Sequence, residues 1–201
     1  MRIFILSALY LLAVSDTCLA KEYTLKDQST GVIERRSETM KLRPNVGVIV
    51  ASDTQRDESG VLGASLLEKA GFKVIKLEVV GNLDVKNAIA TMLANKDIQA
   101  ILCIGGTGIS PHDITVESIK EVCEKELPGY GEYLRMLTRE RWEKQEEKLG
   151  LLFIDTRANA CVTQSKLIFA IPGSPDATEL SITKIIIPGL PTLYGQLQKK
   201  S

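Results

Sequence analysis

From Pro44 onward, apolar residues follow two alternating periods along the chain. Three short runs rich in β-branched residues, VGVIVAS (46–52), FKVIKLEVV (72–80) and IQAILCI (98–104), are typical of strands in a largely buried sheet. Between them, apolar residues recur every three or four positions, which predicts two helices carrying Leu62, Leu66, Leu67 and Ala70, and then Val85, Ile89, Met92 and Leu93. Gly71 is expected to end the first helix as its C-cap.

The order strand, helix, strand, helix, strand predicts an α/β fold. We expect a doubly wound, mostly parallel sheet with helices on both faces, in three layers α/β/α, because consecutive parallel strands need crossover helices. In such a sheet, ligands bind at the carboxyl ends of the strands near a topological switch point. The loop after the third strand is therefore the leading candidate for a site.

That loop reads GGTGISPHDIT, residues 105–115. Its glycines permit a backbone in which several N–H groups point at one anion, and Thr107 and Ser110 add hydroxyl groups. Thr115 is expected to be the N-cap of a helix whose positive end faces the same anion. The loop matches neither the P-loop nor the dinucleotide spacing. It predicts phosphate binding, with a tight turn that holds no ligand as the alternative.

A second loop, Pro172-Gly173-Ser174-Pro175, follows the apolar run 167–171. Pro175 suits the first position of a helix, where its missing N–H costs nothing. We expect this loop to converge with the first on one crevice, although plain turn chemistry would also account for it. Further on, IIIPGLP (185–191) is expected to end one segment and redirect the chain into a final helix.

Composition narrows the function classes. The 25 lysine and arginine residues balance 25 aspartate and glutamate residues, so no global field recruits nucleic acid or an anionic membrane. The four cysteines form no C-x-x-C pair and the chain has one histidine, so we expect reduced, mostly buried thiols rather than a disulfide or a zinc site. These features indicate one domain of ordinary size and argue against a nucleic-acid-binding role.

The N-terminus is organised differently. IFILSALYLLAV (3–14) has the length of a signal peptide, with cleavage expected after Ala20, and is too short to cross a bilayer comfortably. Residues 21–41 are polar and aperiodic. The alternative is a mis-set start, with Met40 as the first residue. We therefore divide the chain into an N-terminal extension, 1–41, and a ligand-binding domain, 42–201.

The motifs GGTGISPHDITVESI and FAIPGSPDATEL, preceded by VGVIVASDTQRDESGVLGASLLEKAGFKV, resemble the MoaB/MogA family of molybdenum cofactor biosynthesis. The resemblance covers about residues 46–197. It implies a molybdopterin adenylyltransferase, which transfers AMP from ATP to the terminal phosphate of molybdopterin with Mg²⁺ and releases pyrophosphate. It also implies a homotrimer or homohexamer and a cytoplasmic location, unless residues 1–20 are a genuine signal peptide.

The same resemblance implies roles for single residues. Asp113 matches the acidic position that holds Mg²⁺ and supports adenylylation. Gly105, Gly106, Thr107 and Gly108 match the loop that binds the pterin and the phosphate. Ser52 and Asp53 match the end of the first strand, and Gly173 and Ser174 match the second ligand loop.

Two departures from the family pattern bear on activity. Asn82 stands where the family commonly has a second functional aspartate, and an uncharged amide would hold Mg²⁺ less well. Thr156-Arg157 replaces a Ser-Arg pair, and Arg157 remains a plausible phosphate partner because its guanidinium binds two oxygens at once. The alternatives are a non-catalytic molybdopterin-binding homologue and a CinA-like nucleotide-processing enzyme.

Two conspicuous residues receive plain interpretations. His112 lies beside Asp113 with no nucleophile pattern around it and is expected to be exposed. Trp142 lies in the charge-rich stretch RERWEKQEEK (139–148), which is expected to be a solvated helix face anchored by this indole.

Overall fold

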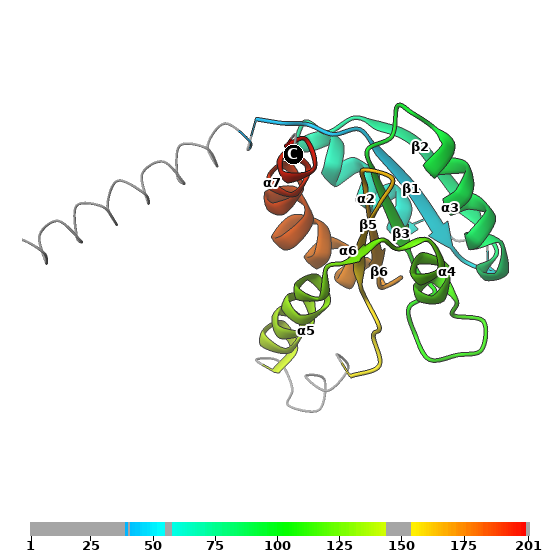
Figure 1. The fold of residues 1–201 in the computed structure, drawn as a ribbon. Coiled ribbons are helices and arrows are strands. Elements are labelled where there is room, and N and C mark those ends of the chain that lie inside the picture. Colours follow the sequence, from blue (N-terminus) through cyan, green and yellow to red (C-terminus); the bar gives the residue numbers. More distant parts are fainter. Residues whose placement is uncertain (1–38, 40, 55–57, 144–153, 200–201) are drawn as a thin grey trace, which may run out of the picture. The chain divides into compact units, whose positions relative to one another are not determined.

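A computed structural model describes residues 39, 41–54, 58–143 and 154–199 (Figure 1). The chain divides between Lys41 and Leu42 into two units, and the second carries the sheet. The apolar run 3–14 and the expected cleavage site after Ala20 lie outside the described residues. Within the described ranges, no helix is long and apolar enough to cross a membrane.

Six strands form one sheet in the order β2-β1-β3-β6-β5-β4. Strands β1, β2, β3 and β6 are parallel, β5 runs antiparallel to β6, and β4 runs antiparallel to β5. The expected mostly parallel α/β sheet is thereby confirmed. The strands are β1 (Val46–Ala51), β2 (Val74–Val80), β3 (Ala100–Ile104), β4 (Lys125–Glu126), β5 (Ala160–Thr163) and β6 (Lys166–Ile171).

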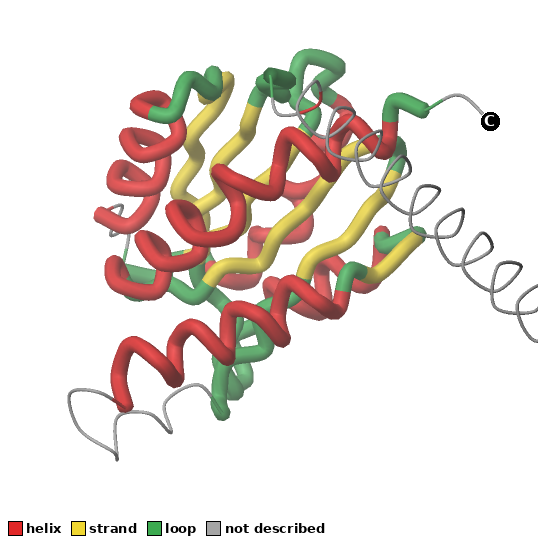
Figure 2. The backbone as a smooth tube through the Cα atoms, turned by 90° about the vertical axis from the view of Figure 1, so that its left-hand side faces the viewer, coloured by secondary structure: helices red, strands yellow, loops and turns green. Residues whose placement is uncertain are grey.

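Helices cover both faces of the sheet, as Figure 2 shows. Residues on successive positions of β1 and β3 point to opposite faces, so Val48 and Leu102 join one apolar core while Ile49 and Ile101 join the other. The first core includes residues of α2, α5, α6 and α7, and the second includes residues of α3 and α4. The helical elements are α2 (Glu58–Lys69), η1 (Asn82–Asp84), α3 (Val85–Ala94), α4 (Thr115–Val122), α5 (Pro128–Glu143), α6 (Pro175–Ser181), η3 (Ile182–Ile186) and α7 (Ile187–Leu197).

The strand order creates a switch point between β1 and β3. The chain leaves β1 through α2 to reach β2 on one side, and then returns through α3 to β3 on the other side. Adjacent loops that leave a parallel sheet in opposite directions open a crevice at the carboxyl ends of the strands. The loops after β1, β3 and β6 all emerge at this edge.

Helix α2 ends as its sequence predicts. Gly71 has a φ of +83°, which is the left-handed conformation that glycine adopts without a Cβ clash. The N–H of Gly71 donates to the Glu68 carbonyl at 2.9 Å, and the N–H of Phe72 donates to the Leu67 carbonyl at 3.0 Å. These two bonds form a Schellman motif, which turns the chain directly into β2.

The C-terminal part differs from the expected break at IIIPGLP. Helical backbone continues from α6 through the π-helical segment η3 into α7, so this stretch does not end the helix. Pro188 lies in the first turn of α7, directly after the π segment. A proline ring clashes with the carbonyl four residues earlier, and the wider π turn relieves that clash.

The cysteines also differ from expectation. Cys123 and Cys161 form a disulfide, so the expectation of reduced thiols is wrong for these two residues. Antiparallel pairing of β4 with β5 places Glu126 opposite Cys161, which brings the end of α4 beside β5 across 38 residues of sequence. Cys103 is a free, buried thiol, and burial raises its pKa to about 12.

Candidate functional site

The loops after β1, β3 and β6 pack against one another at Ala51, Gly105 and Gly173. A Cβ on Gly105 would lie 2.4 Å from the Ala51 carbonyl oxygen, and Gly105 has a φ of +97°. A Cβ on Gly173 would lie 3.1 Å from the Cα of Gly105. Only glycine fits these two contacts without displacement of the backbone. The two glycine-rich loops therefore do converge at one edge of the sheet.

Several amide groups of the first loop have no protein acceptor. The backbone N–H groups of Gly106, Thr107 and Gly108 donate to no residue that the structure describes. Thr107 is 4% exposed and lines a hollow at this edge of the sheet, so a ligand in that hollow could accept its N–H. Consecutive unpaired N–H groups in a glycine-rich turn favour an anion.

Helix α4 starts at the same loop, one residue earlier than expected. Thr115 is the first helical residue, Ile114 precedes it, and no side chain caps the helix, so the N-cap role expected for Thr115 is wrong. The cause is a hydrogen bond of 3.1 Å from the Thr115 N–H to the Gly106 carbonyl, which draws Thr115 into the first turn. Its hydroxyl oxygen is buried without a hydrogen-bond partner in the described residues.

Arg157, which precedes β5, holds the glycine-rich loop through several hydrogen bonds. Its Nε donates to the Gly108 carbonyl at 2.7 Å, one terminal nitrogen donates to the Asp113 carbonyl at 2.6 Å, and the other pairs with Glu117. The Arg157 N–H also donates to the Thr107 carbonyl at 3.0 Å. One residue, remote in sequence, thus holds the loop at residues 107, 108 and 113 and pairs with Glu117 in the first turn of α4.

The pairing of Glu117 with Arg157 changes the pKa of Glu117. Partial burial acts to raise the pKa of Glu117, but the hydrogen bond and charge of Arg157 outweigh it, and the net pKa is lowered. Glu117 therefore stays ionised under ordinary conditions and keeps the guanidinium of Arg157 oriented.

The carboxylate of Asp113 folds back onto its own loop. Its Oδ2 accepts the N–H of Ser110 at 3.0 Å, and the Asp113 N–H donates to the Ser110 carbonyl at 3.0 Å. Oδ1 accepts no hydrogen bond from the described residues. His112 is exposed, as expected, and only its backbone N–H bonds within the loop, to the Ser110 hydroxyl.

Asp53, after the end of β1, and Asn82, after the end of β2, form a polar contact apart from the glycine-rich loop. Asp53 accepts the backbone N–H of Asn82 at 2.8 Å through Oδ1 and the side-chain amide of Asn82 at 3.1 Å through Oδ2. Asn82 therefore donates one hydrogen bond to each carboxylate oxygen of Asp53 and adds no charge of its own. Ser52, next to this pair, donates its N–H to the Val80 carbonyl at 2.9 Å and contacts the Thr54 hydroxyl at 3.1 Å.

The acidic residues do not assemble a metal cage. Within the described ranges no group of three or more His, Cys, Asp or Glu side chains gathers, and no hydrogen bond links Asp113 to Asp53 or Asn82. Mg²⁺ commonly takes one or two carboxylates together with water and substrate phosphates. The free Oδ1 of Asp113 beside a loop of open N–H groups suits that mode of binding.

Two hollows flank the contact between Gly105 and Gly173. The Ser52 hollow, of about 210 Å³, is lined by Ser52, Thr54, Glu58, Ser59 and Gly173 among others. The Trp142 hollow, of about 300 Å³, is lined by Thr107, Gly108, Trp142, Asp155, Thr156 and Ser174 among others. Five of the predicted residues line these two hollows, and Arg157 lines a third one with Lys120 and Glu126. The other predicted residues line none of these three hollows: Asp53, Asn82, Gly105, Gly106, Ser110, Asp113 and Thr115.

The second loop is held in place by neighbouring hydroxyl groups. The hydroxyl of Ser59 donates to the Gly173 carbonyl at 2.8 Å, and that of Thr178 donates to the Pro172 carbonyl at 3.2 Å. Ser174 caps α6 by accepting the Ala177 N–H at 3.3 Å, ahead of Pro175 at the first helical position. Helix α6 therefore begins as the sequence predicts.

Comparisons with known proteins agree with this geometry. The family model described as "Probable molybdopterin binding domain" matches residues 11–192. Molybdenum cofactor biosynthesis protein B of Bacillus subtilis is 40% identical over 159 residues, covering 76% of this chain and 89% of that protein. The chain belongs to the MoaB/MogA molybdopterin-binding family.

Solved structures in this family share the fold. A crystal structure of molybdenum cofactor biosynthesis protein B superposes with a TM-score of 0.72 at 30% identity, covering 79% of this chain and 98% of that chain. The tungsten cofactor synthesizing protein MoaB from Pyrococcus furiosus gives a TM-score of 0.66 at 29% identity, covering 78% of this chain and 98% of that chain. This MoaB/MogA chain therefore takes part in molybdenum cofactor biosynthesis, and molybdopterin is the ligand of its family domain.

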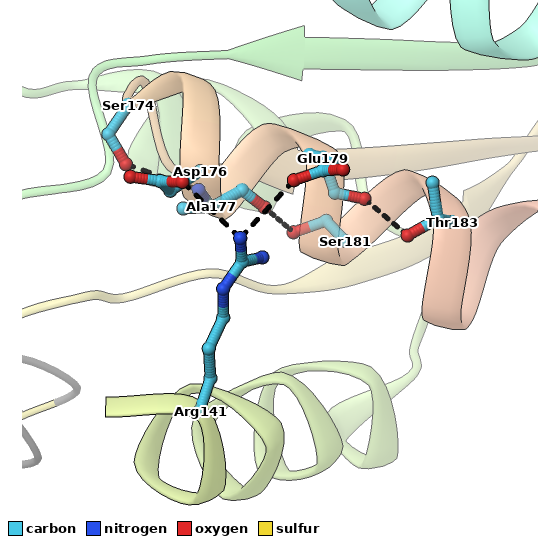
Figure 3. A network of polar contacts seen from close by, with 7 residues as sticks. All are labelled: Arg141, Ser174, Asp176, Ala177, Glu179, Ser181 and Thr183. Atoms are coloured by element: carbon cyan, nitrogen blue, oxygen red, sulfur yellow. Dashed lines mark hydrogen bonds and ion pairs between the residues drawn. The ribbon is translucent and has the colours of Figure 1, made fainter. Parts of the chain in front are cut away.

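Sequence reasoning missed part of this MoaB/MogA site. The described part of 139–148 is the end of α5, where Arg139, Glu140 and Glu143 are exposed and Trp142 is half-buried, as expected for a solvated face anchored by the indole. What the sequence did not indicate is that Trp142 also lines a hollow with Thr107. Arg141 pairs with Asp176 at 3.4 Å and Glu179 at 3.3 Å on α6 (Figure 3). The signal that could have pointed to the hollow is the single tryptophan in the polar last turn of α5, because a large aromatic side chain is costly to leave in water.

Proposed function

We propose that this chain adenylylates molybdopterin. An oxygen of the terminal phosphate of molybdopterin forms a bond to the α-phosphorus of ATP, the bond from that phosphorus to the bridging oxygen of the β-phosphate breaks, and pyrophosphate leaves with the electron pair. The products are adenylyl-molybdopterin and pyrophosphate. Such a reaction brings two anionic groups together, so positioning and charge stabilisation supply most of the catalysis.

The open N–H groups of Gly106, Thr107 and Gly108 support this proposal more than any other observation. They lie at the carboxyl end of β3, beside the uncapped start of α4, whose positive end also favours an anion. In the proposed reaction they hold the terminal phosphate of molybdopterin. Arg157 keeps the carbonyls of Gly108 and Asp113 turned away from that phosphate, because both accept its guanidinium.

Asp113 is the residue that would hold Mg²⁺, together with oxygens of the substrate phosphates. The metal would supply positive charge against the phosphates as they approach. Oδ2 of Asp113 is oriented by the Ser110 N–H, which leaves Oδ1 available as a ligand.

The test is an assay of the purified protein with molybdopterin, ATP labelled at the α-phosphate, and Mg²⁺. We expect label to appear on the pterin in step with released pyrophosphate. Asp113→Asn keeps the loop's size and should lower the rate at least about 100-fold, the scale of a lost electrostatic group in catalysis. Asp97→Asn, on an exposed turn remote from the loop, is the matched control and should leave the rate unchanged. Molybdopterin binding without any transfer of label by the wild type would contradict the proposal.

One observation favours a second candidate, a member that binds molybdopterin without turnover. Both oxygens of Asp53 already accept a hydrogen bond from Asn82, and Asn82 brings no second carboxylate, so this strand end has one charged ligand for a metal instead of two. Retention of molybdopterin binding with no pyrophosphate release, at any Mg²⁺ concentration, would establish this candidate over the first.

We propose a cytoplasmic location and assembly into a homotrimer or homohexamer. Adenylylation consumes ATP, which is a cytoplasmic substrate, and this supports the location. The disulfide is a feature of oxidising compartments and supports export instead. Mass spectrometry of the native protein separates the two, since a chain that starts at Lys21 would contradict a cytoplasmic enzyme. Light scattering gives the assembly, and a monomer would contradict the proposed oligomer.

A further inference from the structure

The two hollows of the crevice offer different chemistry. The Ser52 hollow is lined by hydroxyl groups, aliphatic side chains and one carboxylate, that of Glu58, with no aromatic ring. The Trp142 hollow combines an indole with aliphatic side chains, three threonines and two carboxylates. A flat heterocycle is best held between an aromatic face and an apolar wall, with a few polar groups at its edge. The Trp142 hollow has that composition.

The indole of Trp142 is held by a contact between α5 and α6. The Arg141 guanidinium lies 5.9 Å from the centroid of the Trp142 ring. Figure 3 shows the pairing of the same guanidinium with Asp176 and Glu179. Leu180, on the same helix as these carboxylates, is 7% exposed and lines the hollow with Trp142. The ion pairs therefore fix the spacing between the indole and the apolar wall.

The two carboxylates of the hollow are not equivalent. Asp176 is paired with Arg141, whereas Asp155 is exposed and makes no ion pair or hydrogen bond to any residue that the structure describes. Beside Asp155, the hydroxyl oxygen of Thr156 is buried and also has no partner in the described residues. Asp155 thus brings two carboxylate oxygens to the hollow that accept no hydrogen bond from the described residues, next to the unpartnered hydroxyl of Thr156.

A carboxylate distinguishes the two heterocycles of the proposed reaction. The 2-amino-4-oxo pyrimidine edge of a pterin presents two parallel N–H donors, from N3 and the amino group, in the fork that a guanidinium offers to a carboxylate. The corresponding edge of adenine presents one donor and one acceptor, and its acceptor would face a carboxylate oxygen. The free carboxylate therefore favours a pterin over an adenine.

We propose that the Trp142 hollow is the pterin subsite, in which Trp142 stacks on the ring and Asp155 accepts both donors of its pyrimidine edge. This subsite leaves the phosphate end of the ligand at Thr107 and Gly108, which line the same hollow and carry open N–H groups. The inference rests on the proposed function for the identity of the ligand, molybdopterin, and requires no turnover.

Trp142 provides its own test, because it is the single tryptophan of the chain. Pterin added to the purified protein should quench tryptophan emission, and the titration gives a Kd. The matched ligand is lumazine, which carries a carbonyl in place of the amino group and so loses one donor. Asp155→Asn should weaken pterin binding about tenfold or more, the equivalent of one charge-assisted hydrogen bond, and change lumazine binding less than about twofold.

Two further measurements separate this subsite from its competitor. Glu58→Gln removes the carboxylate of the Ser52 hollow and should leave the pterin Kd unchanged. A loss of pterin affinity in Glu58→Gln but not in Asp155→Asn would overturn the inference, because the pterin would then occupy the Ser52 hollow. Quenching by AMP that is competitive with pterin would overturn it equally, since adenine would then occupy the Trp142 hollow.

The outcome is distinguishable from that of the proposed function. If the wild type transfers no AMP but Asp155→Asn loses its preference for pterin over lumazine, adenylylation fails and the subsite stands. If AMP transfer occurs but pterin and lumazine respond equally to Asp155→Asn, the subsite assignment alone is wrong. Trp142→Phe keeps an aromatic face, so its pterin affinity, followed by pterin fluorescence, should stay within about threefold, whereas Trp142→Ala should lose more.

Discussion

The two acidic positions of the crevice are built in contrasting ways. Asp113 lies in a loop that is held from several directions, by its own Ser110, by Arg157 and by the first turn of α4. Asp53 is held by Asn82 alone among the described residues, through two hydrogen bonds between two strand ends. The Asp113 carboxylate keeps an oxygen that accepts no hydrogen bond from the described residues, while both oxygens of Asp53 accept one from Asn82, whose own Oδ1 is buried without a partner among them. The Asp113 loop is therefore held by more contacts than the pair of Asp53 and Asn82.

The disulfide ties the C-terminal end of α4, the helix that follows the Asp113 loop, to β5, and its loss should have the largest effect on stability. Reduction of Cys123–Cys161 should lower the free energy of unfolding by about 4 kcal/mol, because the bond closes a loop across 38 residues of sequence. Urea unfolding with and without dithiothreitol measures this. The variant Cys123→Ala with Cys161→Ala should not respond to the reductant, and equal wild-type midpoints in both conditions would refute the role given to the bond.

Gly105→Ala should have the next largest effect, with a loss of about 3 kcal/mol in unfolding free energy. The new Cβ meets the Ala51 carbonyl oxygen at 2.4 Å, at a φ of +97° that alanine adopts only with strain. Thermal unfolding gives the change. Gly129→Ala is the matched control, since nothing lies within 4 Å of its added Cβ, and its stability should change by less than about 0.5 kcal/mol. A near-neutral Gly105→Ala would mean that the loops after β1 and β3 are not in contact.

Arg157→Lys tests how firmly the Asp113 loop is held. It keeps the charge but loses the planar fork that serves Gly108, Asp113 and Glu117 at once, and should cost about 2 kcal/mol. Chemical denaturation gives this value, and pyrophosphate affinity should fall with it. Arg139→Lys, in an exposed i,i+4 pair with Glu143, is the control and should change stability by less than about 0.5 kcal/mol. Equal effects of the two variants would show that Arg157 does not organise the loop.

Asn82→Asp tests the contact between Asp53 and Asn82, the acidic position held by fewer contacts. Two carboxylates would then face each other where an amide now satisfies Asp53, at a cost of about 1 kcal/mol without metal. Added Mg²⁺ should restore the melting temperature and, if Asn82 limits turnover, raise the rate of AMP transfer. Asn87→Asp, an exposed position on α3, adds the same charge and should show no rescue by Mg²⁺. The same response to Mg²⁺ in both variants would remove Asn82 from the explanation.

The smallest effect concerns Glu117 and pH. Its folded pKa is lowered, so its contribution to stability is present above the ordinary value of 4.5 and is lost as the pH falls through the lowered pKa. Wild type and Glu117→Gln should therefore differ in melting temperature near neutral pH and converge in more acidic solution. A difference that stays constant across this range would show that the ion pair with Arg157 does not contribute.

The sequence by itself determined the local elements of this protein. The period of apolar residues predicts β1 to β3 and the helices between them. A strand in a buried sheet is a continuous apolar run, whereas a helix buried on one face has an apolar residue at every third or fourth position. Gly71 and the pair Ser174-Pro175 mark the end of α2 and the start of α6, since backbone conformation and missing or unpaired N–H groups are properties of neighbouring residues. The glycine-rich loop after β3, and the prediction that it binds phosphate, follow from the same local rules.

Tertiary structure alone decided which distant side chains complete the site. The bonds of Arg157 to Gly108 and Asp113 span 49 and 44 residues, and the contact of Asp53 with Asn82 spans 29. No periodicity carries such information, because these contacts depend on strand order and on the angles at which loops leave the sheet. The same holds for the disulfide across β4 and β5 and for the position of Trp142, whose role depends on α5 packing against α6. Local chemistry thus determined what the loop can bind, and the packing of distant elements determined what surrounds the ligand.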